Sequence, residues 1–596
     1  MKETTLALLS LFISLNAHAA ATDQQIINQQ NQILQRQQQF EVAKERQTQL
    51  KEVAKEQQKI QEEESMELDI GKAEVIQDFS KIQCFEVLKI EFSENKILKK
   101  SEEKFLTKNY VHKCLATEQI IELKKEINDY LIEQGYVTSR AVIPMQNLSD
   151  GILKIEILES YLEKVIFNED KFFDKTQKFT AFGFSENEKV LNLKKFEQGL
   201  DQINRLPSNS AALKILPGNK INNSIIAIEN HPQNTSRINA TYDNYGSAST
   251  GENRDTISFA QDNLLHLNDS LNLSRTANDL DQNMKKGHSN SFNSTFSVPF
   301  TWYNLTLSFA QSSYGLLAKD EAHSKIWGTT TTKSIGFDRV LIKNNKFKIA
   351  GNFLLTNRYN QNFNGDVKID DTSRKLSTAS FALPLTIFLQ DSTLFLKPNF
   401  LKSATIFDAK KDSRSLPSNA AHSEFEIFKF YGNYSKKAVI PYLETPTYYN
   451  LTFDSQASKQ KLYGIDQFSV GGIYSVRGFK EGSIANDSGY NIKNEFTLNL
   501  GQTILPHLNL EQMPESLKYL NNFSLTPFYD YGYIRSKGGD QSGRLSGAGF
   551  KTSFNHKNFS ASLTFSWAIS KSQHLLQNNS ENNAIYFDVN SELGFF

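Results

Sequence analysis

The chain of 596 residues lacks several features that mark familiar soluble classes. Its 66 basic and 66 acidic residues leave no net charge, so there is no global field to attract nucleic acid, and we expect no nucleic-acid partner. The G-x-x-x-x-G-K-[ST] phosphate-binding sequence is missing, as are G-x-S-x-G and H-E-x-x-H. We therefore predict no catalytic residues, no cofactor, no metal and no enzymatic activity.

Long apolar runs are scarce as well. No segment after the N-terminus approaches the ~20 apolar residues that a transmembrane helix needs. Residues 1–20 are different. Leu6–Leu15 form a short apolar core, and Ala17-His18-Ala19 has the small-x-small pattern that precedes a signal-peptide cleavage site. This pattern predicts a secretory signal peptide over residues 1–20 and an exported mature chain.

Cysteine is almost absent, since only Cys84 and Cys114 occur. In an exported chain, two cysteines on neighbouring elements of one small domain favour a disulfide. A metal site is the alternative, but His112 alone does not complete a ligand set around these thiols. We predict a Cys84–Cys114 disulfide.

Residues 21–64 form a polar segment rich in Gln, Glu and Lys. From residue 23 onward this segment contains no Gly or Pro, and its thin apolar stripe changes register along its length. The pattern predicts a helix, either solvated or part of an irregular coiled coil, and its polarity would also suit a water-filled lumen. Residues 65–83 have no sustained period and are interpreted as a linker.

Residues 84–161 and 162–233 each predict a small αβ unit. In the first unit we expect a strand at 85–92, a helix at 104–115, a second helix with Thr117 as its N-cap and Gly135 beyond its end, and two closing strands. The second unit repeats this order more loosely, with a helix over 193–206 that Pro207 ends. The open strand edges of each unit could bind an extended peptide. The alternative is that both units are structural spacers.

Residues 234–596 alternate between apolar and small polar side chains. Phe559, Ala561, Leu563, Phe565 and Trp567, for example, alternate with Ser560, Ser562, Thr564 and Ser566. A soluble β-sandwich would also alternate, but aromatic residues at segment ends and segments of about ten residues favour a transmembrane antiparallel β-barrel. The length of this region allows roughly 14 to 18 strands.

The last residues resemble the barrel-insertion signal of outer-membrane proteins, which ends on an aromatic residue. Phe595 shares a register with Ile585, Phe587, Val589 and Leu593, whereas Phe596 lies in the other register. The barrel-insertion signal is therefore placed at Phe595 and Phe596, and the pattern fits Phe595 better.

Several motifs resemble the two-partner secretion transporters of the outer-membrane assembly superfamily. Gly135-Tyr136-Val137-Thr138-Ser139-Arg140 and Gly151-Ile152-Leu153-Lys154-Ile155 resemble the first polypeptide-transport-associated (POTRA) domain of that family. Val476-Arg477-Gly478-Phe479 and Phe528-Tyr529-Asp530-Tyr531-Gly532 resemble its loop and barrel-wall motifs. The resemblance implies sixteen barrel strands, two βααββ POTRA domains and a plug helix over residues 21–64.

The same resemblance implies a latch between a loop and the barrel wall. Its residues would be Val476, Arg477, Gly478, Phe479, Phe528, Asp530 and Gly532. Arg477 would meet Asp530, because a guanidinium binds a carboxylate through two parallel hydrogen bonds. Gly532 would leave room for the loop.

The function that the resemblance implies is export of a large partner exoprotein across the outer membrane of a Gram-negative bacterium. The POTRA domains would bind the partner's N-terminal secretion signal in the periplasm by strand addition, without nucleotide hydrolysis. Known partners in the family include adhesins, cytolysins and contact-dependent growth-inhibition toxins. Membrane lipid, the barrel-assembly machinery and a monomeric state are also expected. An insertase of the same superfamily and a passive porin are the alternatives.

Overall fold

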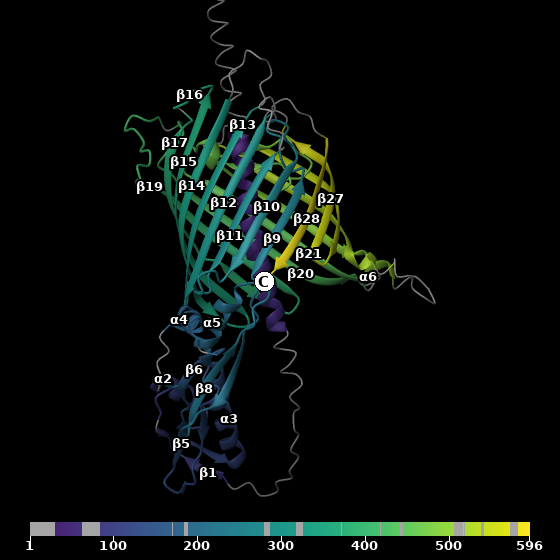
Figure 1. The fold of residues 1–596 in the computed structure, drawn as a ribbon. Helices are drawn as coiled ribbons and strands as arrows, with labels where there is room; N and C mark the ends of the chain where they lie inside the picture. The colour runs from purple at the N-terminus through teal and green to yellow at the C-terminus, as the bar shows by residue number, and fades with distance from the viewer. Residues whose placement is uncertain are drawn as a thin grey trace, which may run out of the picture.

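The computed structural model describes residues 30–61, 84–93, 95–169, 171–183, 189–278, 287–316, 326–370, 372–417, 419–440, 445–505, 517, 519–537, 542–572 and 582–595. Two αβ units lie in line below a large β-barrel, and a helix passes through the barrel (Figure 1). The predicted signal peptide, the predicted linker and Phe596 lie outside the described residues. No helix in the described part of the chain is both long and apolar enough to cross a bilayer.

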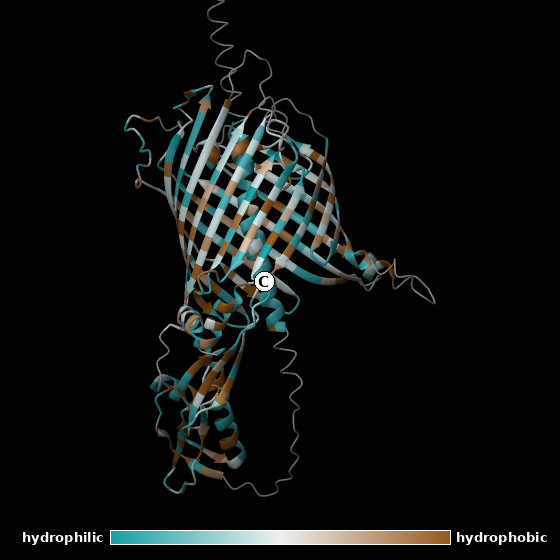
Figure 2. Cartoon of the chain, in the orientation of Figure 1, coloured by the Kyte–Doolittle hydropathy of each residue, from teal (hydrophilic) through white to brown (hydrophobic). Residues whose placement is uncertain are grey.

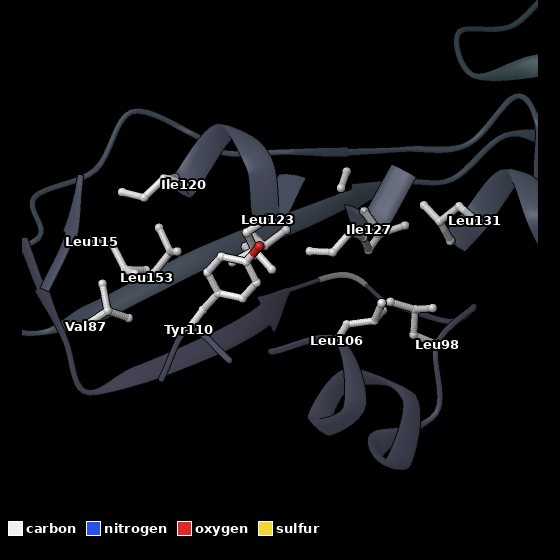
Figure 3. Packing of buried hydrophobic residues seen from close by; sticks show 13 residues of the cluster. Val87, Leu98, Leu106, Tyr110, Leu115, Ile120, Leu123, Ile127, Leu131 and Leu153 are labelled. Atoms are coloured by element: carbon white, nitrogen blue, oxygen red, sulfur yellow. The ribbon is translucent and has the colours of Figure 1, made fainter. Parts of the chain in front are cut away.

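The first αβ unit contains two sheets and two helices. Its elements are β1 (Cys84–Val87), β2 (Lys89–Ser93), α2 (Lys100–Thr107), β3 (Lys113–Ala116), α3 (Thr117–Glu133), β4 (Arg140–Val142) and β5 (Ile152–Leu158). The main sheet has the order β2-β5-β4, and β1 pairs separately with β3. Leu123, Ile127 and Leu131 of α3 are fully buried against the sheet, which explains the helical period of the sequence (Figure 3).

Three local predictions in this unit are wrong. The strand expected over 85–92 is divided at Leu88 into β1 and β2, which belong to different sheets. The helix expected over 104–115 ends at Thr107, because residues 113–116 pair with β1 and place Leu115 in the core. This tertiary pairing overrides the helical preference of the segment. The N-cap of α3 is Ala116 rather than Thr117, and the Gln119 side chain accepts the Ala116 N–H at 2.9 Å.

The second αβ unit has one sheet beneath two helices. Its elements are β6 (Tyr161–Phe167), α4 (Phe172–Phe182), α5 (Leu193–Asn204), β7 (Ala212–Pro217) and β8 (Asn223–Glu229). The sheet order is β6-β8-β7, with β6 parallel and β7 antiparallel to β8. The Asn192 side chain accepts the Lys194 N–H and caps α5.

The barrel is a closed antiparallel sheet. Its strands are β9 (Ser236–Asp243), β10 (Arg254–Asp262), β11 (Ser270–Asn278), β12 (His288–Phe300), β13 (Tyr303–Gly315), β14 (Ile326–Lys343), β15 (Phe347–Asn364), β16 (Val367–Lys368), β17 (Arg374–Ala382), β18 (Leu385–Phe388), β19 (Ser392–Ala404), β20 (Glu426–Ile440), β21 (Thr445–Ser458), β24 (Ser488–Asn499), β25 (Phe523–Arg535), β26 (Ser542–His556), β27 (Phe559–Lys571) and β28 (Asn583–Phe595). Because β17 and β18 both pair with β15 and β19, they form one wall strand, and β16 only extends β15. The described residues therefore give sixteen wall strands, as the family resemblance implied.

The wall closes where β28 pairs with β9, and Phe595 lies opposite Ser236 at the end of that ladder. Apolar and polar residues alternate along the strands, which appears as a checkered wall in Figure 2. Closure removes the free strand edges, so every strand in the bilayer can satisfy its backbone hydrogen bonds within the sheet.

Two segments occupy the barrel interior. Residues 30–61 form the lumenal helix, drawn in purple in Figure 1. At 1.5 Å per residue its 32 residues extend about 48 Å, long enough to traverse the barrel. Residues 459–487, between β21 and β24, form the lumenal loop, which contains η1 (Gly464–Asp466), β22 (Phe468–Val470) and β23 (Ile484–Asn486). The short helices α6 (Leu500–Ile504) and η3 (Tyr519–Asn522) lie between β24 and β25.

Candidate functional site in the barrel lumen

The lumenal loop packs on the inner wall through a small apolar core. β22 and β23 form a short antiparallel hairpin, and the loop motif Val476-Arg477-Gly478-Phe479 lies between them. Val476 and Phe479 are buried. Their cluster consists of Phe468, Val470, Val476, Phe479, Ile484, Ile534 and Leu545. The apolar positions of the motif therefore anchor the loop to β25 and β26.

Arg477 and Asp530 are brought together beneath this core. Arg477 donates from Nε to Asp530 Oδ2 and from Nη2 to Oδ1, both at 2.7 Å, and its backbone N–H donates to Oδ2 at 3.0 Å. The side chains of Arg477 and Asp530 are 3% and 0% exposed. Such a fork of two charge-assisted hydrogen bonds fixes both position and orientation.

Strand geometry explains why the wall motif presents its groups to the loop. Phe528, Asp530 and Gly532 share one parity of β25 and are buried, whereas Tyr529 and Tyr531 point to the other face. The Arg477 guanidinium carbon lies 3.5 Å from the centre of the Phe528 ring, so the ring covers the face of the cation.

Glycines permit the close approach of loop and wall. A Cβ on Gly532 would lie 2.9 Å from side-chain carbons of Val470 and Val476, and one on Gly547 would overlap the Arg477 carbonyl oxygen. Gly478 has φ +105°, and a Cβ there would lie 2.9 Å from the backbone of Trp567 and Ala568. Gly532 and Gly547 therefore exclude a side chain for lack of space, and Gly478 excludes one because of its backbone conformation as well.

Glu495 belongs to the same site but was not predicted. It lies on β24 and accepts a hydrogen bond from Arg477 Nη1 at 2.7 Å. The guanidinium is thus shared between two carboxylates. The sequence offered only one signal for Glu495, an acidic residue at a lumen-facing position of a strand. Such residues are common in a water-filled barrel, so this signal does not distinguish Glu495 from the others.

A second buried arginine, Arg254, was also missed. It forms a bidentate pair with Asp243 of β9 at 2.8 and 3.0 Å and reaches the hydroxyl of Tyr474 in the lumenal loop at 3.2 Å. The ring of Phe40 in the lumenal helix lies 4.6 Å from its guanidinium carbon. No periodic pattern in the sequence singles out Asp243 as the partner of Arg254.

The lumenal helix contacts the loop and the wall mainly through polar side chains. Near its start, Gln35 donates to the Gly464 carbonyl at 2.5 Å and Arg36 donates to the Lys480 carbonyl at 2.8 Å. In its middle, Arg46 forms a bidentate pair with Asp454 at 2.8 and 2.9 Å. Only Ile33 and Leu34 are buried apolar residues of this helix.

The far end of the lumenal helix meets the second αβ unit. Glu56 pairs with Lys343 at 2.9 Å and with Lys348 at 3.0 Å, and Lys343 also binds Asp201 of α5. Lys59 lies 3.7 Å from the same Asp201 carboxylate. The helix, the barrel rim and α5 therefore share one ionic cluster.

The remaining predicted site residues lie outside the lumen. Cys84 and Cys114 form a disulfide with Cα atoms 5.4 Å apart, and it ties β1 to β3 in the first αβ unit. Tyr110 lies in the core of the same unit. Burial and the neighbouring Glu126 raise the pKa of its phenol to about 12, so it is neutral at physiological pH. Phe595 ends β28.

A closed sixteen-stranded barrel with a filled lumen, preceded by αβ units, defines an outer-membrane transporter with a periplasmic part. Comparison with known protein families leads to the same conclusion. A ShlB-type POTRA domain matches residues 85–160, a second POTRA domain matches residues 161–217, and the haemolysin secretion/activation protein ShlB/FhaC/HecB family matches residues 222–554. The chain belongs to this last family, and it is an outer-membrane transporter of two-partner secretion rather than an insertase.

Individual relatives carry the same description. The outer membrane transporter CdiB of Dickeya dadantii is 30% identical over 425 residues, which cover 69% of this chain and 72% of the relative. The hemolysin transporter protein ShlB of Serratia marcescens is 27% identical over 66% of this chain and 69% of its own. The solved structure of CdiB from Escherichia coli shares the fold, with a TM-score of 0.77, 24% identity and coverage of 91% and 98%.

Proposed function

We propose that the lumenal helix closes the transporter at rest and that a partner exoprotein crosses the lumen, unfolded, after the helix has left. The observation that carries this proposal is the polar character of the helix contacts, since Ile33 and Leu34 are its only fully buried apolar side chains, while Phe40, Leu50 and Val53 are half-buried. Burying two such side chains contributes about 3–6 kcal/mol, and partly exposed ion pairs add about 0–1 kcal/mol each. A plug held largely by polar contacts can be displaced by a competing ligand that replaces those contacts.

Removing the plug should open the pore. Deleting residues 30–61 is expected to raise single-channel conductance in planar bilayers, and Arg46→Ala should increase the frequency of openings, because Asp454 loses its bidentate partner. Lys51→Ala is the matched control: it removes a positive charge from an exposed position of the same helix. Unchanged conductance after the deletion would reject the plug.

Signal recognition is assigned to the periplasmic sheets. β7 is an edge strand, paired only with β8 in the described structure, and Ile215 and Leu216 on it are exposed. An extended N-terminal secretion signal could add to this edge by backbone hydrogen bonds, with apolar side chains beside Ile215 and Leu216. Specificity would then come from side chains and affinity from the backbone.

Photo-cross-linking tests this assignment. A benzophenone amino acid at Leu216 is expected to capture the partner's N-terminal segment, whereas the same group at Phe105, an exposed apolar position on α2, should not. Equal capture at both positions would mean that β7 is not the binding edge.

The Arg477–Asp530 pair is proposed to act as a latch that keeps the lumenal loop on the wall while the partner passes. The pair has no substrate to act on, and its burial suits a fixed structural contact. With no nucleotide motif in the sequence, the driving force would be folding of the partner outside, where burial of its apolar surface opposes return. We further propose a monomer that the barrel-assembly machinery inserts through β28.

A further inference from the structure

Exposed aromatic residues gather on α4, on the side of the second POTRA domain that lies beneath the barrel rim. Phe172 is 73% exposed, Phe173 is 52% exposed, and Phe179 is exposed as well. Phe172, Lys175 and Phe179 are spaced by three and four residues, so they share one outward line of the helix. These rings lie outside the domain core, to which α4 contributes Ala181 and the partly buried Phe182.

The same patch continues onto the barrel. Phe300, at the periplasmic end of β12, is exposed and lies 5.4 Å from the ring of Phe179. Phe300 has the lipid-facing parity of β12, shared with Phe292, which is also exposed. Leu264 and Leu265, in the turn between β10 and β11, are exposed beside His266, whose ring is 4.0 Å from Phe173.

Hydrogen bonds hold α4 in this position. The Thr301 N–H donates to the Thr180 carbonyl at 2.8 Å, Thr176 donates its hydroxyl to the His266 carbonyl at 2.8 Å, and Asn268 donates to the Gln177 carbonyl at 2.8 Å. Figure 1 shows α4 directly below the barrel wall, with α5 beside it. The exposed aromatic line is therefore fixed at the level of the membrane surface.

We propose that α4 is a membrane-docking helix that inserts Phe172, Phe173 and Phe179 into the periplasmic leaflet of the outer membrane. The molecule that this exposed face of α4 contacts is phospholipid. Aromatic side chains favour the interface between acyl chains and headgroups, and a basic residue on the same line, Lys175, can bind headgroup phosphate. The three phenylalanine rings extend the apolar, lipid-facing surface of the barrel wall. On a periplasmic domain without contact to the membrane, such an exposed apolar patch would favour aggregation.

Docking would fix the second POTRA domain against the membrane. The partner-binding edge β7 would then keep one orientation towards the pore, because α4 and β7 belong to the same small domain. This inference does not depend on the plug or on the latch.

Single-cysteine labelling of the full-length protein in proteoliposomes tests the proposal. The native cysteines are bonded to each other, so a cysteine placed at 172 or 179 can be labelled selectively with a nitroxide. We expect these labels to be accessible to oxygen and protected from a water-soluble nickel chelate. The control is Ile221→Cys, an apolar position that is 92% exposed, in the turn between β7 and β8 remote from the barrel.

Two lipid compositions and a folding control complete the test. Vesicles containing phosphatidylglycerol should protect the labels more than phosphatidylcholine alone, and Lys175→Gln should reduce this difference. Each variant is first checked for the heat-dependent gel shift of a folded barrel. Labels at 172 and 179 that meet the nickel chelate as freely as one at 221 would overturn the proposal. Protection that appears only with the partner's N-terminal segment would also overturn it, because the patch would then bind the partner.

Discussion

Replacing Arg477 by alanine should release the lumenal loop. The substitution leaves the buried carboxylates of Asp530 and Glu495 without the cation that they share. Breaking a buried ion pair by removing one partner costs about 3–5 kcal/mol. If that cost acts on the loop alone, the open population rises roughly 150- to 5,000-fold, since each 1.36 kcal/mol is a factor of ten.

Limited proteolysis measures this population. Trypsin cleaves after Lys480, which lies in the lumenal loop three residues after Arg477. When the loop opens and closes faster than it is cleaved, the cleavage rate is proportional to the fraction of molecules whose loop is released from the wall. We expect Arg477→Ala to accelerate this cleavage by the same large factor and to reduce export of the partner, while the barrel stays inserted.

The matched control is Arg237→Ala. Arg237 also forms a bidentate carboxylate pair, with Asp262 at 2.8 Å, but both residues belong to the wall and neither touches the lumenal loop. Equal acceleration in the two variants, or none in Arg477→Ala, would refute the latch. A double replacement, Arg477→Met with Asp530→Leu, should recover part of the loss, because it removes one of the stranded charges.

Three further outcomes are expected. Gly547→Ala should also speed cleavage after Lys480, because its Cβ would overlap the Arg477 carbonyl oxygen, and Gly351→Ala on β15, whose Cβ would meet its nearest neighbour at 3.7 Å, is the control for an added methyl group. Cys84→Ser with Cys114→Ser should lower the unfolding free energy of the first POTRA domain by about 3–4 kcal/mol, the loop-closure value for a separation of 30 residues, measured by denaturant titration. Raising salt from about 0.15 to about 1 M should make openings more frequent in the intact channel but not after deletion of residues 30–61, because the Debye length falls from about 8 to about 3 Å.

Sequence reasoning paired Arg477 with Asp530 but did not find all the other residues of the site. The parity of Phe528, Asp530 and Gly532 was readable, because strand side chains alternate whatever the tertiary context. Glu495 and Arg254 were not found, because their partners lie on other strands and in the loop, and lumen-facing charges are common. The helical assignment of residues 113–115 failed for a related reason, since their pairing with β1 is a contact between separate elements.

The sequence by itself determined the kind of elements and their order. Period-two alternation and period-3.6 stripes depend only on local geometry, so the barrel, the αβ units and the polar helix could be predicted. Only the tertiary structure decided where the polar helix lies, which carboxylates share Arg477, and how α4 meets the barrel rim. Those contacts join residues from 18 to more than 400 positions apart on separate elements, and the folded barrel, rather than any local pattern, brings them within bonding distance.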